Sequence, residues 1–298
     1  MPSISDSTLS RRVLPQMHLG ISSIYPPAPF SAGLRLSPDF VRVKPGRFIF
    51  SFRKGNLIGM KPTVAKALAG KGKKLAIFDV DGTIFRSSLL IKLVDELIAE
   101  KLFKPGVESE YLKLRENWLN REGSYEAYIG GVIRAFDGNL KGIKYVDLRR
   151  IAHRVVVREK SHTYRFTRDL ATTLKKKGYF VLAISHSPKL VVENFCKTLG
   201  FSKVYGMMNE LDASGRFTGQ ALFKDIIFDK AKILERNLAK GGLTLKGSIG
   251  VGDTESDIAF LKMVERPIAF NPNKKLYTYA KKHGWEVVVE RKDVIYKI

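Results

Sequence analysis

The sequence predicts an α/β protein with a doubly wound, Rossmann-like parallel sheet that carries an inserted helical cap and a small β-hairpin. From residue 75 onward, short and nearly continuous apolar runs alternate with segments of helical periodicity. This alternation is typical of parallel strands that are covered by helices on both faces. The first two apolar runs, 75–78 and 180–185, are separated by about 100 residues, far more than one crossover between parallel strands requires. The chain therefore has room for an additional helical unit in that interval.

Six apolar runs are the expected strands of the sheet. They are LAIF (75–78), FVLAIS (180–185), KVYGMM (203–208), SIGVG (248–252), PIAF (267–270) and EVVVE (286–290). Apolar residues recur with helical spacing between and after these runs. The corresponding helices are expected near 164–177, 188–199, 229–240, 254–265 and 273–283.

Two insertions interrupt the alternation of strands and helices. Residues 86–160 contain three stretches in which apolar residues recur every three or four positions, as they do in amphipathic helices. We therefore expect a helical cap in this interval. Residues 207–222 carry Ser214-Gly215 between two extended segments, which indicates a β-hairpin.

Residues 1–59 differ in composition from the rest of the chain. They hold eight Lys and Arg residues, two acidic residues and nine serines, and no helical or strand period persists. We expect disorder or loose structure there. The segment is either an organelle transit peptide or an upstream extension before a start at Met60. The core domain with the sheet is then expected in 60–85 together with 161–298, in a cytoplasmic protein unless residues 1–59 direct it to an organelle.

The overall composition indicates a soluble globular protein. Of the 298 residues, 44% are hydrophobic and 27% are charged, and no apolar stretch approaches the roughly 20 residues that span a bilayer. The single cysteine, Cys196, excludes an intramolecular disulfide and a cysteine-based zinc site. The net charge of +23 favours anionic partners, but the basic residues are spread along the chain without a nucleic-acid-binding motif. By charge alone the partner could be nucleic acid, an anionic membrane or a small phosphorylated substrate; we expect no nucleic acid, and a monomer or a homodimer.

Three of the expected strands end on polar residues that suit a site. Asp79, Ser185 and Asp253 each follow or close an apolar run, and ligands of such sheets bind beyond the carboxyl ends of the strands. Each residue also has a simpler interpretation. Asp-Gly is a common turn dipeptide, and a serine before a helix is a common helix cap. Polar residues at the ends of three strands together favour a ligand-binding site over three separate turns and caps.

Four ordered motifs give the chain a family resemblance. They are DVDGT (79–83), ISHSP (184–188), Lys230 in DKAKIL and GDTESD (252–257). Together they resemble the motifs of the haloacid-dehalogenase-like (HAD) phosphatase superfamily. The long helical insert after the first motif makes the chain similar to the subfamily of phosphoserine phosphatases and related small phosphomonoesterases. This resemblance covers residues 75 to 285 and implies a HAD core with a helical cap.

The resemblance implies a Mg²⁺-dependent phosphomonoester hydrolase that works through an aspartyl-phosphate. Asp79 would attack phosphorus as the nucleophile, and Asp81 would protonate the leaving alkoxide and then activate water. Mg²⁺ takes oxygen ligands, and Asp79, the backbone carbonyl of Asp81 and Asp253 would hold it. Asp257, four residues further on, would orient the metal's waters from the second shell. The two carboxylates of the first motif then have separate tasks.

Positive charge and hydrogen-bond donors are needed around a phosphate. Lys230 is the expected cation, with Lys232 and Lys224 as weaker candidates. Ser185 and the backbone N–H of His186 would hold phosphate oxygens, and the His186 side chain is a candidate for contact with the substrate.

Further binding residues are expected near the same motifs. Gly82 allows the backbone to approach the phosphate closely, and Thr83 either bonds the phosphate or fixes the turn. Ser256 is a candidate phosphate contact in the fourth motif. Arg86 either reaches a second anionic group of the substrate or lies at the cap hinge. The aromatic residues Trp118, Tyr125 and Tyr128 are expected in the core of the cap.

One position departs from the pattern of the subfamily. Phosphoserine phosphatases that resemble this chain carry a carboxylate nine residues beyond the nucleophile, where it holds the substrate's amino group. Here that position is Ser88, and Arg86 lies nearby. The departure favours a substrate without an ammonium group. Two other functions remain open: a phosphotransferase with the same intermediate, and a basic protein that binds nucleic acid or membrane with a vestigial site.

Overall fold

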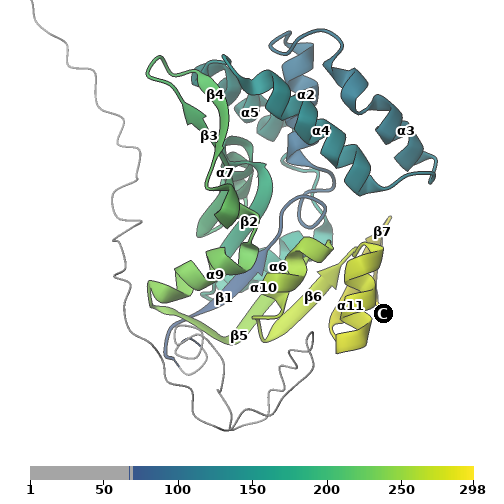
Figure 1. The fold of residues 1–298 in the computed structure, drawn as a ribbon. Coiled ribbons are helices and arrows are strands. Elements are labelled where there is room, and N and C mark those ends of the chain that lie inside the picture. The colour runs from purple at the N-terminus through teal and green to yellow at the C-terminus, as the bar shows by residue number, and fades with distance from the viewer. Residues whose placement is uncertain (1–66, 68–69) are drawn as a thin grey trace, which may run out of the picture. The chain divides into compact units, whose positions relative to one another are not determined.

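The computed structural model describes Ala67 and residues 70–298, so the predictions for residues 1–59 and for Met60 lie outside the described part. An eight-stranded sheet with the order β4-β3-β2-β1-β5-β6-β7-β8 forms its centre (Figure 1). The pairs from β3 to β7 are parallel, and the edge strands β4 and β8 are antiparallel to their neighbours. The strands are β1 (Lys73–Phe78), β2 (Phe180–Pro188), β3 (Lys203–Leu211), β4 (Phe217–Leu222), β5 (Leu243–Gly252), β6 (Arg266–Phe270), β7 (Glu286–Arg291) and β8 (Val294–Lys297).

Helices cover both faces of the sheet, as the near-continuous apolar strands predicted. Successive side chains of a strand point to opposite faces, so Ile77 of β1 joins one apolar cluster and Phe78 joins another. Helices α6 (Arg165–Lys176) and α7 (Lys189–Thr198) complete the Phe78 cluster. The Ile77 cluster contains residues of α9 (Lys230–Ala239), α10 (Ile258–Leu261) and α11 (Lys274–His283). The doubly wound fold is thereby confirmed.

Outside residues 86–160, the predicted elements and the observed ones differ most in three places. The helix expected over 254–265 is shorter, because a 3₁₀ turn (Glu255–Asp257) precedes the single-turn α10. The single-turn helix α8 (Lys224–Ile227) and the edge strand β8 were not predicted. Both are four residues long, too short to show a clear hydrophobic period.

Four α-helices lie within residues 86–160, the interval in which the cap is expected. They are α2 (Leu89–Ala99), α3 (Leu112–Leu119), α4 (Tyr125–Leu140) and α5 (Tyr145–Glu159), and Figure 1 shows them gathered at one end of the sheet. Buried residues of α2, α4 and α5 belong to the same apolar cluster as those of α6 and α7. The apolar core of these helices is therefore continuous with one face of the sheet.

The predicted β-hairpin forms from β3 and β4 and is joined to the helices by backbone hydrogen bonds. The Gly142 N–H donates to the Phe217 carbonyl at 2.8 Å, and the Phe217 N–H donates to the Ile143 carbonyl at 2.9 Å. The Tyr145 N–H donates to the Gly215 carbonyl at 2.9 Å. These bonds hold the connection between α4 and α5 against the hairpin. In the described part of the chain, no helix combines the length and apolarity that a membrane span requires.

Candidate active site

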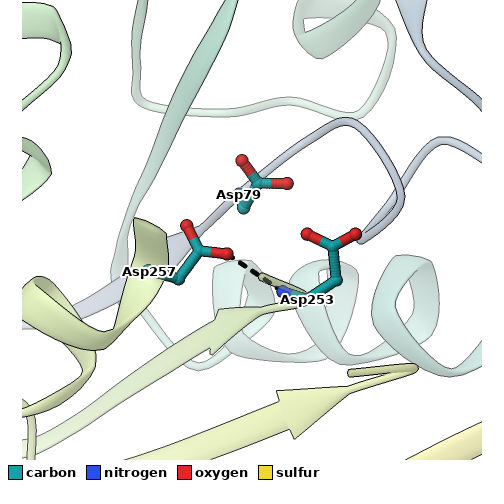
Figure 2. A group of neighbouring side chains, drawn as sticks. All are labelled: Asp79, Asp253 and Asp257. Carbon is teal, nitrogen blue, oxygen red and sulfur yellow. Dashed lines mark hydrogen bonds between the residues drawn. The ribbon is translucent and has the colours of Figure 1, made fainter. Parts of the chain in front are cut away.

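Three carboxylates meet where the neighbouring strands β1 and β5 end. Asp79 directly follows β1, Asp253 directly follows β5, and Asp257 closes the 3₁₀ turn after β5. Because β1 and β5 are parallel neighbours, their carboxyl ends lie at the same edge of the sheet. Each of the three carboxylates offers an oxygen within 4.8 Å of the others (Figure 2). The structure therefore brings together three of the acidic residues that the sequence singled out.

Lys230 joins this cluster from the first position of α9. Its side chain is buried, and Nζ donates to Asp79 Oδ1 at 2.6 Å and to Asp257 Oδ1 at 2.5 Å. Burial alone would lower the pKa of Lys230, but the charges and hydrogen bonds of Asp257 and Asp79 raise it above its usual value. Lys230 is therefore a permanent cation between two carboxylates. Of the rival lysines, Lys232 is half exposed and pairs with Asp229 at 3.6 Å.

One ammonium does not neutralise the whole cluster. Burial first, and then the charges of Asp257 and Asp81, raise the pKa of Asp79 to about 7, although Lys230 opposes the rise. Burial and the neighbouring carboxylates likewise raise the pKa of Asp253 well above its usual value. Asp79 Oδ2 is buried and has no hydrogen-bond partner among the described residues. A carboxylate oxygen of this kind suits a further cation, and a hard divalent ion such as Mg²⁺ fits the all-oxygen donor set.

Asp257 has a different role in this geometry from Asp79 and Asp253. Its Oδ2 accepts from the backbone N–H groups of Asp253 at 3.0 Å and Thr254 at 3.1 Å, while its Oδ1 accepts from Lys230. Both oxygens are thus committed to groups of the protein. This arrangement fixes the loop that carries Asp253 and agrees with a position in the second shell of a metal.

Gly82 makes the approach between the first and fourth motifs possible. Its φ of +80° lies in the left-handed region, and its N–H donates to the carbonyls of Phe85 and Ser87, each at 3.0 Å. A Cβ at this position would lie 2.1 Å from Asp253 Oδ2. The first motif therefore needs glycine for its backbone conformation and for the space that Asp253 occupies.

We expect Gly82→Ala to lower the free energy of unfolding by about 3 kcal/mol, because left-handed strain and overpacking add. Gly215→Ala is the matched control, since Gly215 has a φ of +74° and nothing within 4 Å of its Cβ position. The control should lose about 1 kcal/mol, from the backbone alone. Urea denaturation measures both values. Equal losses in the two variants would contradict the proposed contact with Asp253.

Asp81 is held by donors from two other segments. Ser185 Oγ donates to Asp81 Oδ2 at 2.5 Å, and the Leu89 N–H donates to Oδ1 at 2.6 Å. Burial raises the pKa of Asp81, and hydrogen bonds from Ser185, Leu89 and Ser187 partly oppose the rise. The sequence did not single out Ser187, whose hydroxyl also accepts from the Leu90 N–H at 3.2 Å. Its position as the second serine of the ISHSP motif was the sequence signal by which Ser187 could have been found.

Thr83 and Ser256 lie near the cluster but differ in exposure. The Thr83 side chain is fully buried, and its carbonyl accepts from the Thr167 hydroxyl at 2.8 Å. The Thr83 hydroxyl itself has no hydrogen-bond partner among the described residues, so both expectations for Thr83 stay predictions. Ser256 is exposed, and its hydroxyl shares a 2.8 Å hydrogen bond with Thr254.

Arg86 and His186 lie in different surroundings. Arg86 is exposed, and its guanidinium lies over the Tyr164 ring at 5.7 Å from the centroid. The His186 ring packs against Phe228, with 5.1 Å between the centroids. His186 Nε2 is buried and has no hydrogen-bond partner in the described part of the chain.

Two observations at the helices bear on the substrate. Ser88 is the N-cap of α2, where its hydroxyl accepts from the Leu90 N–H, so this position carries a helix cap in place of a carboxylate. Tyr125 was expected in the cap core with Trp118 and Tyr128, and its ring does contact both. Unlike Tyr128, however, Tyr125 is 36% exposed. The charges of Asp81, Asp253 and Asp79 add to burial in raising the pKa of its phenol.

The chain is similar in sequence to known proteins. The family model of haloacid dehalogenase-like hydrolases matches residues 76–262. A phosphoserine phosphatase of Archaeoglobus fulgidus is 29% identical over 208 residues, which cover 68% of this chain and 54% of that protein. A histidinol-phosphatase of Neisseria meningitidis is 27% identical over 229 residues, covering 72% of this chain and 98% of that protein. The chain thus spans about half the length of the first relative and nearly all of the second.

A solved structure supports the fold assignment. A protein of unknown function from Bordetella pertussis Tohama I matches with a TM-score of 0.59 at 22% identity, covering 73% of this chain and 98% of that one. The family model spans more than half of the chain, including the first and fourth motifs and Lys230. The chain therefore belongs to the haloacid dehalogenase-like hydrolase family.

Proposed function

We propose that this enzyme is a Mg²⁺-dependent phosphatase that hydrolyses a small phosphomonoester through an aspartyl-phosphate on Asp79. The main support is the buried triad in which Lys230 contacts both Asp79 and Asp257 while Asp79 Oδ2 lacks a partner among the described residues. A purely structural ion pair has no need of a second, unpartnered oxygen beside a strand end. Relatives named as phosphatases support the same reaction class.

Asp79, Asp253 and the backbone carbonyl of Asp81 would hold the metal, and Asp257 would orient this set. Bound Mg²⁺ would supply positive charge beside the phosphate and so reduce its repulsion from the carboxylates. Lys230 would add a fixed charge from the protein itself. The donor set fits the ion because every proposed ligand atom is an oxygen.

Two displacements at phosphorus would then follow. One carboxylate oxygen of Asp79 attacks phosphorus, and the ester oxygen leaves with a proton from Asp81. In the second displacement Asp81 takes a proton from water, whose oxygen attacks phosphorus and releases the Asp79 carboxylate. The Ser185 hydroxyl and the His186 N–H would hold phosphate oxygens. For this the Ser185 hydroxyl must exchange its present acceptor, Asp81, for the phosphate.

Helices α2–α5 would act as the cap predicted over residues 86–160. Lys275 on α11 lies 2.6 Å from Glu255 Oε1 and 3.6 Å from Glu126 Oε2 on α4. It thereby bridges the cap helix and the loop that follows β5. A cap held in this position would exclude water during the first displacement.

Phosphate release from a panel of phosphomonoesters, with and without Mg²⁺, tests the proposed function on the full chain. Release that requires the metal is the expected result. A folded protein that releases no phosphate from any ester would overturn the proposal. The same panel with added alcohols separates hydrolysis from phosphotransfer, because a phosphotransferase would form a new phosphate ester.

A further inference from the structure

A row of side chains on α4 connects the catalytic carboxylates with helix α8. Tyr125, Ile129, Ile133 and Asp137 recur every four residues and so form a continuous ridge on the helix surface; we refer to them as the α4 ridge. Over twelve residues the ridge extends about 18 Å. Ile133 is 40% exposed although it is apolar. The ridge therefore offers an apolar surface with one aromatic end.

Contacts at both ends show where the α4 ridge lies. At the first end, Glu126 is next to Tyr125 and interacts with Lys275, which also holds Glu255 beside Asp253. At the other end, α4 packs against β4, which ends at Leu222, two residues before α8 begins at Lys224. The interval between the two ends therefore lies between the strand-end carboxylates and α8.

Aromatic side chains of the core lie in the same interval. Phe228 directly follows α8, two residues before Lys230, and is 57% exposed. Its ring contacts His186, which follows the phosphate-binding candidate Ser185. Burial first, and then the charge of Lys230, lower the pKa of His186 to about 4. The imidazole is therefore neutral at physiological pH and adds an uncharged aromatic face.

The charged groups that this interval contains lie far from the proposed phosphate site. Ser88, which is closer, is occupied as the cap of α2. Asp137 is twelve residues from Tyr125 on α4, about 18 Å along the helix. Lys224 opens α8 at the same end of the interval, so a small zwitterion bound at the phosphate site would not reach them. An exposed isoleucine and an exposed phenylalanine beside a catalytic centre are the kind of surface that marks a binding site for an apolar group.

We infer that the substrate is the phosphomonoester of an alcohol with an apolar or aromatic body, held between the α4 ridge and the Phe228–His186 pair. This inference rests on the proposed function, because the phosphate must occupy the site at Asp79 and Ser185. Tyr125 would lie beside the ester oxygen, and Ile133 and Phe228 would contact the far part of the alcohol. Phosphoserine, whose body is charged, would fit poorly.

Three phosphate esters test the inference on the full chain with Mg²⁺. Propyl phosphate and 3-phenylpropyl phosphate have similar alkoxide leaving groups and differ in apolar surface, and O-phosphoserine is the zwitterionic comparison. We expect kcat/KM for 3-phenylpropyl phosphate to exceed that for propyl phosphate at least about tenfold, because a single methylene group in an apolar pocket already changes kcat/KM by about that factor. O-phosphoserine should be the poorest of the three. Ile133→Asn and Phe228→Ser should each reduce the ratio of the two alkyl esters about fivefold or more.

Val157→Asn is the matched control, because Val157 is 54% exposed on α5 and belongs to neither surface. It should leave the ratio unchanged. Equal kcat/KM for the propyl and phenylpropyl esters, or a preference for O-phosphoserine, would overturn the inference while the proposed phosphatase function stands. An unchanged ratio in both variants would also overturn it. Release of phosphate from none of the esters would remove the proposed function, and the inference with it.

Discussion

Asp79→Asn should abolish Mg²⁺-dependent phosphate release, with a loss in kcat of at least about a thousandfold. The amide has nearly the shape of the carboxylate, but it is a poor nucleophile and brings no negative charge to the metal. The cleanest measurement is single-turnover phosphate release under saturating Mg²⁺. With the parent protein, rapid acid quenching should also trap a phosphoenzyme, and the variant should form none.

The stability of this variant separates lost chemistry from lost folding. The pKa of Asp79 is raised from 3.8 to about 7 in the folded protein, so without metal the folded state binds this proton more tightly than the unfolded state does. The parent's free energy of unfolding therefore falls as the pH rises from about 4 to about 7, and the variant should lack this part of the fall. At pH 8 the variant should be no less stable than the parent.

Asp169→Asn is the control for Asp79→Asn, because Asp169 is an exposed carboxylate on α6 that pairs with Arg168. It should retain full activity. An active Asp79→Asn protein would show that another group attacks phosphorus, and the site would then need a different interpretation.

The fold was predictable because its signals are local. The apolar runs that became β1, β2, β5 and β6 are nearly continuous, since helices cover both of their faces. By contrast, β8 is a four-residue edge strand in which only Ile295 is partly buried and the other residues are exposed, and it is too short to show a clear hydrophobic period. The helix expected over 254–265 is instead a 3₁₀ turn (Glu255–Asp257) followed by the single-turn α10. The Asp257 carboxylate accepts the N–H groups of Asp253 and Thr254, and its contact with Thr254 forms the capping box with which the 3₁₀ turn begins.

The candidate site was predictable to the extent that it lies at strand ends. Asp79 and Asp253 had to share an edge of the sheet once β1 and β5 were parallel neighbours. The pairing of Ser185 with Asp81 joins residues 104 positions apart, and no local pattern reports such a contact. Tyr125 has the helical spacing of a core aromatic, so only the fold shows that it is exposed near the carboxylates. Sequence patterns thus indicate which side chains are candidates for a site, and the packing of the fold determines which of these side chains lie in contact.

Lys230→Gln should destabilise the metal-free protein by about 3–5 kcal/mol at pH 8, which is typical when one partner of a buried ion pair is removed. Asp79 and Asp257 would then keep their buried charges without the ammonium that now contacts both. The loss should be smaller at pH 6. Without Lys230 the pKa of Asp79 rises further, so the carboxyl takes up a proton at the lower pH and no longer carries an uncompensated charge. Chemical denaturation at the two pH values measures the difference.

Lys232→Gln is the matched control, since Lys232 lies two residues further along α9, is half exposed and pairs with Asp229. An exposed pair of this kind contributes at most about 1 kcal/mol, and the control should show no dependence of its loss on pH between 6 and 8. The two variants also decide which lysine serves the phosphate. Loss of kcat by about a hundredfold in Lys230→Gln, with normal turnover in Lys232→Gln, is the expected result. The reverse pattern would show that the buried lysine only holds the carboxylates together and that the phosphate draws its positive charge from the rim of the site.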